Sequence, residues 1–138
     1  MHRIVNASAK DGRYAASIRM GNPVSGKTPE ALLYFRMSDD YQSGYAVKLD
    51  ADTDQVYLYR IDGGAYTLIW SVYWTLNANQ YYAVQVDFSD TTISVSVDGT
   101  TAFTRYNQTA YNDFNHTRFA LGTHDVPYDD QGGCNDEI

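Results

Sequence analysis

The 138-residue sequence is poor in several residue types on which common catalytic and folding devices depend. Its single cysteine, Cys134, has no internal disulfide partner, so the fold must be held together by packing. Its two glutamates, Glu30 and Glu137, lie at distant positions, so no strand carries the pair of glutamates typical of a glycosidase. Its three histidines, at positions 2, 116 and 124, are too scattered to predict a metal triad or a Ser-His-Asp arrangement.

Basic residues and long apolar runs are also scarce. Lysine and arginine total 10 against 17 acidic residues, the formal net charge is −7, and no basic cluster occurs. Because nucleic-acid binding depends on clustered Lys and Arg, no nucleic-acid partner is predicted. No run approaches the roughly 18 apolar residues of a membrane span, and the start MHRIVNASAK has no apolar core of the length that a signal peptide needs.

The abundant residues favour β-structure. Of the 20 aromatic residues 13 are tyrosine, and no segment shows a long helical period. Apolar and polar residues instead alternate in short runs, separated by turn-forming pairs such as Asp98-Gly99. About nine such runs predict an all-β fold, a two-sheet antiparallel β-sandwich of the jelly-roll type. We expect one domain over residues 1–138, with a core at 13–123 and an acidic tail at 124–138.

Three consecutive runs within residues 31–61 organise the rest of the chain. Their alternation gives each predicted strand an aliphatic face and a polar or aromatic face. In the first run Leu33, Phe35 and Met37 share the parity predicted to point into the core. The opposite parity of the three strands collects Tyr34, Arg36, Lys48, Tyr57 and Tyr59 on one outward face.

This outward face has the composition of a shallow sugar-binding site. Sugars stack their C–H faces on aromatic rings, while charged groups bond to their hydroxyls. The sequence therefore predicts a carbohydrate site formed by Tyr34, Arg36, Lys48, Tyr57, Tyr59 and Trp74. An ordinary outer sheet surface, on which Tyr and Lys shield the backbone, explains the same pattern equally well.

Residues 65–74 are apolar on both parities. Such a run is buried on both sides, bends midway, or leaves aromatic side chains exposed to a partner. For Trp70, Tyr73 and Trp74 the pattern favours core packing over ligand binding.

Aspartates offer two weaker alternatives. Asp87 and Asp98 are a conceivable acidic pair for catalysis, but most aspartates of this chain stand at turns, where carboxylates cap backbone N–H groups. Asp50, Asp52 and Asp54 have the opening spacing of a calcium loop. That match fails further on, because Gln55 and Ile61 occupy the positions of the required glycine and glutamate, so a solvated hairpin is favoured.

Three stretches resemble the concanavalin A-like lectin/glucanase superfamily. They are LLYFRMSDDYQSGYAVKLDADTDQVYLYRIDGGAYTLI, QYYAVQVDFSDTTISVSVDGTTAF and FALGT, within roughly residues 13–123. More narrowly, they are similar to the laminin-G-like jelly-roll modules attached to fructan-degrading, exo-inulinase-like and other glycoside hydrolases. Such modules usually close with a further strand after the Leu-Gly segment, which the tail GGCNDEI does not obviously supply.

The resemblance implies a non-catalytic, lectin-like accessory module that binds an oligo- or polysaccharide and is secreted or displayed at the cell surface. It allows a parent multidomain chain or a homodimer. Some relatives hold structural calcium in loops, so the tail around Asp125, Asp129 and Asp130 is a candidate calcium site, although no cofactor is required. The alternatives are a protein-interaction or structural domain of a larger secreted or surface protein, and a glycoside hydrolase.

Overall fold

The computed structural model describes residues 2–8, 11–20 and 30–123. These residues form ten β-strands and no helix. The strands are β1 (His2–Ser8), β2 (Gly12–Arg19), β3 (Glu30–Met37), β4 (Gly44–Asp50), β5 (Gln55–Asp62), β6 (Ala65–Tyr73), β7 (Tyr81–Ser89), β8 (Thr92–Val97), β9 (Thr100–Arg105) and β10 (Arg118–Thr123).

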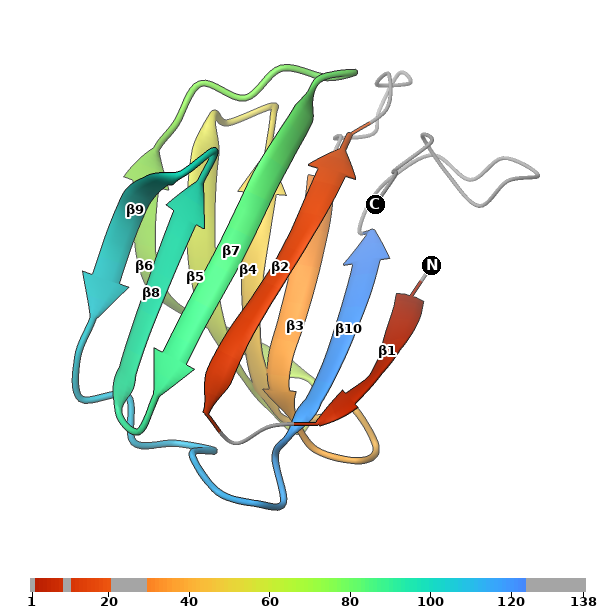
Figure 1. The fold of residues 1–138 in the computed structure, drawn as a ribbon, viewed down its shortest axis with the longest axis vertical. Coiled ribbons are helices and arrows are strands. Elements are labelled where there is room, and N and C mark those ends of the chain that lie inside the picture. The colour runs from red at the N-terminus through yellow and green to blue at the C-terminus, as the bar shows by residue number, and fades with distance from the viewer. Residues whose placement is uncertain (1, 9–10, 21–29, 124–138) are drawn as a thin grey trace.

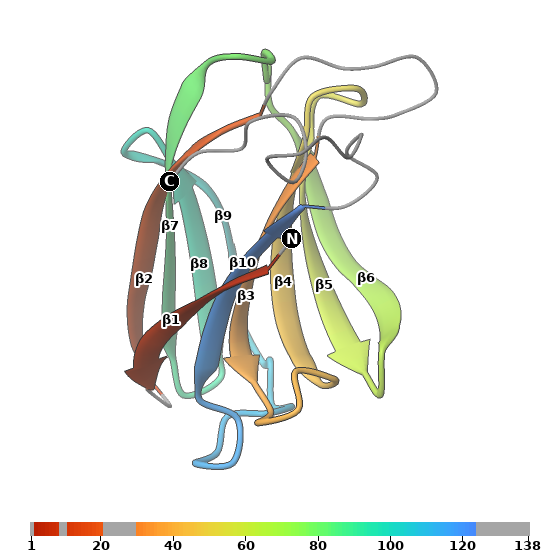
Figure 2. The ribbon, with the colours of Figure 1, turned by 90° about the vertical axis from the view of Figure 1, so that its right-hand side faces the viewer.

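The strands are arranged in two antiparallel sheets that pack face to face. The six-stranded sheet has the order β1-β10-β3-β4-β5-β6, and the four-stranded sheet has the order β2-β7-β8-β9. Figure 1 shows the four-stranded sheet in front of the other, and Figure 2 shows the two layers side by side. The predicted two-sheet antiparallel sandwich is therefore confirmed.

The core lies between the two sheets and follows from the alternation in the sequence. Along β7, buried side chains alternate with side chains on the outer surface of the four-stranded sheet. The largest cluster of buried side chains joins both sheets; it includes Leu33, Phe35, Val47, Leu49, Val56, Leu58, Tyr82, Val84, Val86, Phe88, Val95, Phe119 and Leu121. Burial of these residues supplies the main stabilisation of a fold without internal disulfides.

Strand β3 departs from simple alternation at Arg36, which has a positive φ of 49°. The pairing of β3 with β10 shifts register at this point, as in a β-bulge. Met37 packs in a second cluster on the other side of the sheet from Phe35, so its predicted inward orientation is wrong. The backbone at Gly44 lies very close to the backbone at Arg36: a Cβ added to Gly44 would lie 2.5 Å from the Arg36 carbonyl oxygen.

Strand β6 forms one end of the six-stranded sheet and contains a second irregularity. Leu58 pairs with Trp70, whereas the next β5 residue, Tyr59, pairs with Leu68, so Ile69 is an extra residue. This irregularity lies in the run for which the sequence left three alternatives open: burial on both sides, a bend, or exposed aromatic side chains. Four apolar side chains of this strand are exposed: Tyr66, Leu68, Trp70 and Tyr73.

Some predictions fall outside the described residues. The acidic tail at 124–138, with Cys134 and the candidate calcium ligands Asp125, Asp129 and Asp130, is among these. Within the described ranges there is no helix long and apolar enough to cross a membrane.

Candidate functional site

The outer face of the six-stranded sheet, which points away from the four-stranded sheet, carries four of the six predicted site residues: Tyr34, Lys48, Tyr57 and Tyr59. The backbone register places them in cross-strand rows. One row runs Leu32, Lys48, Tyr57, Ser71, and the next runs Tyr34, Ala46, Tyr59, Leu68.

Lys48 lies at the centre of this face. Its Nζ is 3.2 Å from Oε2 of Glu30 and 3.8 Å from Oδ2 of Asp50, both of which are buried. The same ammonium lies 4.6 Å from the ring centroid of Tyr57 and 5.4 Å from that of Tyr59. Burial disfavours the charged form, but the Glu30 carboxylate outweighs this effect and raises the pKa of Lys48. Lys48 is therefore a fixed cation flanked by two aromatic rings.

A chain of tyrosines continues from Lys48 to the edge of the sheet. The rings of Tyr57 and Tyr59 are stacked at 5.8 Å, and Tyr66 meets Tyr59 edge-on at 5.7 Å. The Tyr66 hydroxyl lies 3.1 Å from the Tyr34 hydroxyl, and the Tyr57 hydroxyl is 2.9 Å from Oγ1 of Thr53. These contacts hold the rings as a preformed surface.

A hollow of about 290 Å³ opens on this face. Leu32, Lys48, Tyr59 and Tyr66 line it. It thus joins an apolar side chain, two aromatic rings and a cation, which is the mixture that a small polar ligand with apolar faces requires.

Three of the predicted site residues, Lys48, Tyr57 and Tyr59, are brought together and remain partly accessible. Tyr34 lies on the same face but is only 6% exposed. Burial and the bond with the Tyr66 hydroxyl raise its pKa far above the usual value, so the hydroxyl stays protonated. Tyr34 therefore supports the surface rather than presenting its ring to a ligand.

The predicted outward position of Arg36 is wrong. The bulge turns its side chain between the two sheets, where it is fully buried. Its guanidinium lies 5.3 Å from the ring centroid of Phe88, and Nη2 is 3.2 Å from Oδ1 of Asp11. Arg36 is consequently unable to contact a ligand on the outer face.

Trp74 also lies away from the outer face. It packs against the main core, in agreement with the core-packing alternative. Trp70 points to the inner face, as does its pairing partner Leu58, but it lies at the edge of the sheet. There the guanidinium carbon of Arg105, on β9, lies 4.0 Å from the Trp70 ring centroid.

Sequence reasoning missed Tyr66 and Leu68 as members of the outer face. Both precede the extra residue Ile69, which changes the parity of the strand between Leu68 and Trp70. An alternation pattern read straight through residues 65–74 groups Tyr66 and Leu68 with Trp70 and so assigns them to one face. The sequence pattern allows a bend and exposed aromatic side chains in this run, but it does not locate the bulge.

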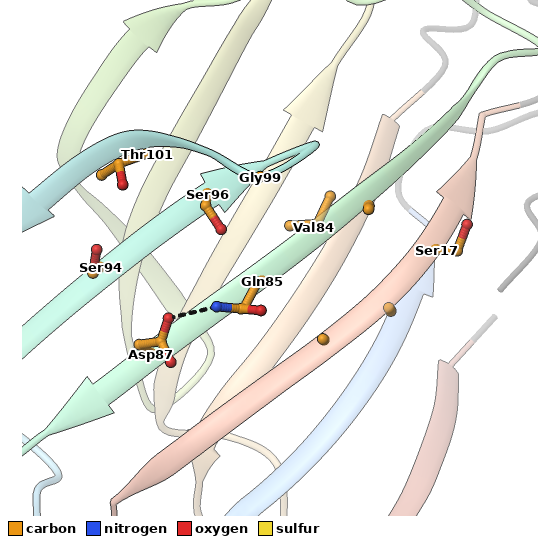
Figure 3. Close-up of a pocket in the computed structure, with 11 residues that line it drawn as sticks. Ser17, Val84, Gln85, Asp87, Ser94, Ser96, Gly99 and Thr101 are labelled. Atoms are coloured by element: carbon orange, nitrogen blue, oxygen red, sulfur yellow. Dashed lines mark hydrogen bonds between the residues drawn. The ribbon is translucent and has the colours of Figure 1, made fainter.

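A second hollow, of about 470 Å³, lies on the outer surface of the four-stranded sheet. Figure 3 shows its lining, to which Ser17, Gln85, Asp87, Ser94, Ser96 and Thr101 contribute. It is larger than the hollow at Lys48, but its lining residues include no aromatic ring and no cation. We therefore place the candidate site at Lys48, where the stacking surface is.

Asp98 and Asp87, the conceivable acidic pair, have separate structural roles. Oδ1 of Asp98 accepts a bond from the Ala83 N–H at 2.8 Å, whereas Asp87 accepts one from Nε of Arg13 at 2.7 Å. Each carboxylate thus has a partner of its own, a backbone N–H for Asp98 and a guanidinium for Asp87, as the turn and surface interpretation predicts.

The Asp50 turn is a hairpin between β4 and β5, in which Asp52 and Thr53 are exposed and Asp50 is buried. Oδ1 of Asp50 accepts bonds from the N–H groups of Asp52 and Thr53, and Oδ1 of Asp54 accepts one from Leu76. Among the described residues, no group of three or more His, Cys, Asp or Glu side chains is placed to hold a metal ion.

Comparisons with known proteins establish the fold. No family model matches the sequence, and no curated protein matches it closely enough to count as a relative. Among solved structures, the carbohydrate-binding module CBM66 from Bacillus subtilis superposes with a TM-score of 0.74 at 18% identity, over 87% of this chain and 71% of that one. A tetrameric galectin from the ball sponge Cinachyrella gives 0.65 at 14% identity, over 99% and 93% of the two chains.

A β-glucanase from Bacillus licheniformis is also similar, with a TM-score of 0.62 at 17% identity, over 90% of this chain and 57% of that one. These similarities confirm the fold, a two-sheet jelly-roll sandwich. The narrower assignment to laminin-G-like or exo-inulinase-like modules stays a prediction.

Proposed function

We propose that this chain is a lectin-like, non-catalytic carbohydrate-binding module whose ligand lies on the outer face of the six-stranded sheet. The observation that carries the proposal is the position of Lys48, fixed by Glu30 and Asp50 beside the rings of Tyr57 and Tyr59. The rings offer a stacking surface, and the ammonium offers a donor to sugar hydroxyls. The similar structures named as a carbohydrate-binding module and a galectin support this class of function.

The charges at the site favour a neutral sugar. One ammonium and the two carboxylates of Glu30 and Asp50 sum to −1, within a chain of net charge −7. A uronate or sulfate group placed beside Lys48 would meet this negative charge in a partly buried setting, where screening is weak. We infer that neutral oligo- or polysaccharides are preferred over acidic ones.

The proposed setting follows from the resemblance in sequence. We propose a secreted or cell-surface location and a role as an accessory domain in a longer chain, such as a fructan-degrading or other glycoside hydrolase. The rival function is a protein-interaction or structural domain. The exposed side chains of β6 favour that rival, because apolar side chains that gather at a surface commonly mark a partner site.

A glycan array tests the proposal. Purified protein is screened against fructans, β-galactosides, β-glucans, uronic-acid polymers and sulfated glycans, with calcium and with chelator. We expect saturable binding to one neutral class. A blank array would contradict sugar binding and favour the interaction domain, and a preference for sulfated or uronic-acid glycans would contradict the charge argument.

A further inference from the structure

Strand β6 presents an open edge of the six-stranded sheet. No strand in the described part of the chain pairs with its outer side, and Figure 2 shows β6 as the last strand of its layer. The strand spans Ala65–Tyr73 and projects exposed side chains on both faces of the sheet, from 42% exposure at Trp70 to 69% at Tyr73. An edge of this kind is a template for pairing with another strand.

The composition of β6 makes a second copy of this chain a suitable partner. Residues 63–86 contain no charged side chain, although the whole chain has a net charge of −7. Natural proteins commonly protect edge strands with lysine or proline, and β6 has neither. Two acidic molecules repel each other over most of their surfaces, and an uncharged strand lets them approach without placing carboxylates face to face.

The extra residue Ile69 gives β6 a pattern that matches itself. Before it, Tyr66 and Leu68 point to the outer face, because Leu68 pairs with Tyr59 of that face. After it, Ser71 and Tyr73 point to the outer face, because Ser71 pairs with Tyr57 of the same face. An antiparallel pair of identical strands brings outer-face residues together when Tyr66 lies opposite Tyr73 and Leu68 lies opposite Ser71. The inner-face residues Ile69 and Trp70 then also lie opposite each other.

We propose that two copies of this chain associate through antiparallel pairing of their β6 strands in this register. The two-fold axis is perpendicular to the sheet, so the same patch is used on both copies. The paired sheets become one continuous sheet, and both outer faces point the same way. If the proposed sugar site is correct, the dimer presents two such sites on one side and gains affinity for polymers through multivalency; the pairing itself does not rest on the sugar site.

The association is tested by sedimentation velocity across the micromolar range, where an interface of modest affinity is populated. We expect a dimer that dissociates on dilution, and a monomer for Leu68→Lys, which places two ammonium groups at the interface. Phe114→Lys is the matched control, because Phe114 is 82% exposed and lies outside β6. A monomer at all concentrations, or a dimer of equal strength in Leu68→Lys, would overturn the proposal.

The register is tested by cysteine cross-linking in a Cys134→Ser background. Protein with Leu68→Cys is mixed with protein carrying Ser71→Cys and a mass tag, and mildly oxidised. Directly opposite residues are close enough for a disulfide, so we expect a cross-linked heterodimer as the main product. Thr101→Cys, on the four-stranded sheet, replaces Ser71→Cys in the control mixture. Equal cross-linking in both mixtures, or none in either, would overturn the register whatever the outcome of the glycan array.

Discussion

The hydroxyl of Tyr34 lies 3.1 Å from the hydroxyl of Tyr66, although the two residues belong to strands separated by β4 and β5. The β4 residue opposite Tyr34 is Ala46, whose methyl group is fully covered. A small residue at this position leaves room for the Tyr34 ring to extend over the sheet toward the edge. The pair thus ties the centre of the six-stranded sheet to its last strand and anchors one wall of the hollow at Lys48.

The Tyr34–Tyr66 contact predicts an energetic coupling between β3 and β6. Tyr34→Phe and Tyr66→Phe each remove one hydroxyl with little change in ring packing. A double-mutant cycle on the free energy of unfolding, measured with urea, should give a coupling of about 0.5 to 1.5 kcal/mol. Additive effects of the two substitutions would contradict a bond between the hydroxyls.

Arg36→Ala should destabilise the protein rather than remove a sugar contact. The substitution leaves a void between the sheets and removes the ion pair between Arg36 and Asp11. We expect a loss of about 2 to 4 kcal/mol in the free energy of unfolding. The control is Arg13→Ala, which breaks the exposed ion pair with Asp87 and should cost less than about 1 kcal/mol. Equal losses in the two variants, seen by urea unfolding, would place Arg36 at the surface.

Asp87 predicts a dependence of stability on acid pH. Partial burial raises the pKa of its carboxyl, but the bonds from Arg13 and Gln85 outweigh this effect, and the net pKa is lower than usual. A lowered pKa in the folded state contributes stability that is present above the unfolded value of about 3.9 and is lost as the pH falls through the folded value.

The advantage of wild type over Asp87→Asn in the free energy of unfolding should therefore shrink as the pH falls below about 4. Urea unfolding at a series of pH values measures it. A gap that stays constant down to strongly acid pH would contradict the proposed ion pair. The lowered pKa also keeps Asp87 ionised near neutral pH, which makes it unsuited to act as the general acid of a hydrolase.

Most of the fold could be predicted from the alternation of apolar and polar residues along the strands. Along β7 and β8 the period of two holds without interruption, so residues such as Val86 and Val95 were assigned correctly to the core. The same logic brought Lys48, Tyr57 and Tyr59 together, because β4 and β5 pair in register over their whole length. One buried face is enough to fix such strands from their sequence.

The errors at Arg36, Tyr66 and Leu68 arise at two bulges. At Arg36 a positive φ rotates an arginine into the interior, where Phe88 and Asp11 compensate its charge, and both partners are distant in sequence. At Ile69 one extra residue moves Tyr66 and Leu68 to the outer face. Neither site carries a glycine, the residue that most often signals such irregularities, so pattern alone did not locate them.

The central claim is that a sugar binds at Lys48, Tyr57 and Tyr59, and calorimetric titration with the neutral glycan selected on the array tests it most directly. Wild type is compared with Lys48→Met, Tyr57→Ala and Gln85→Ala, the last of which alters the larger hollow on the four-stranded sheet. We predict that Lys48→Met and Tyr57→Ala weaken binding by about 1 kcal/mol or more, roughly fivefold in Kd, while thermal unfolding shows both to be folded. Gln85→Ala should bind as wild type does. Unchanged binding in the first two variants with a loss in Gln85→Ala would contradict this account and place the sugar on the opposite side of the sandwich.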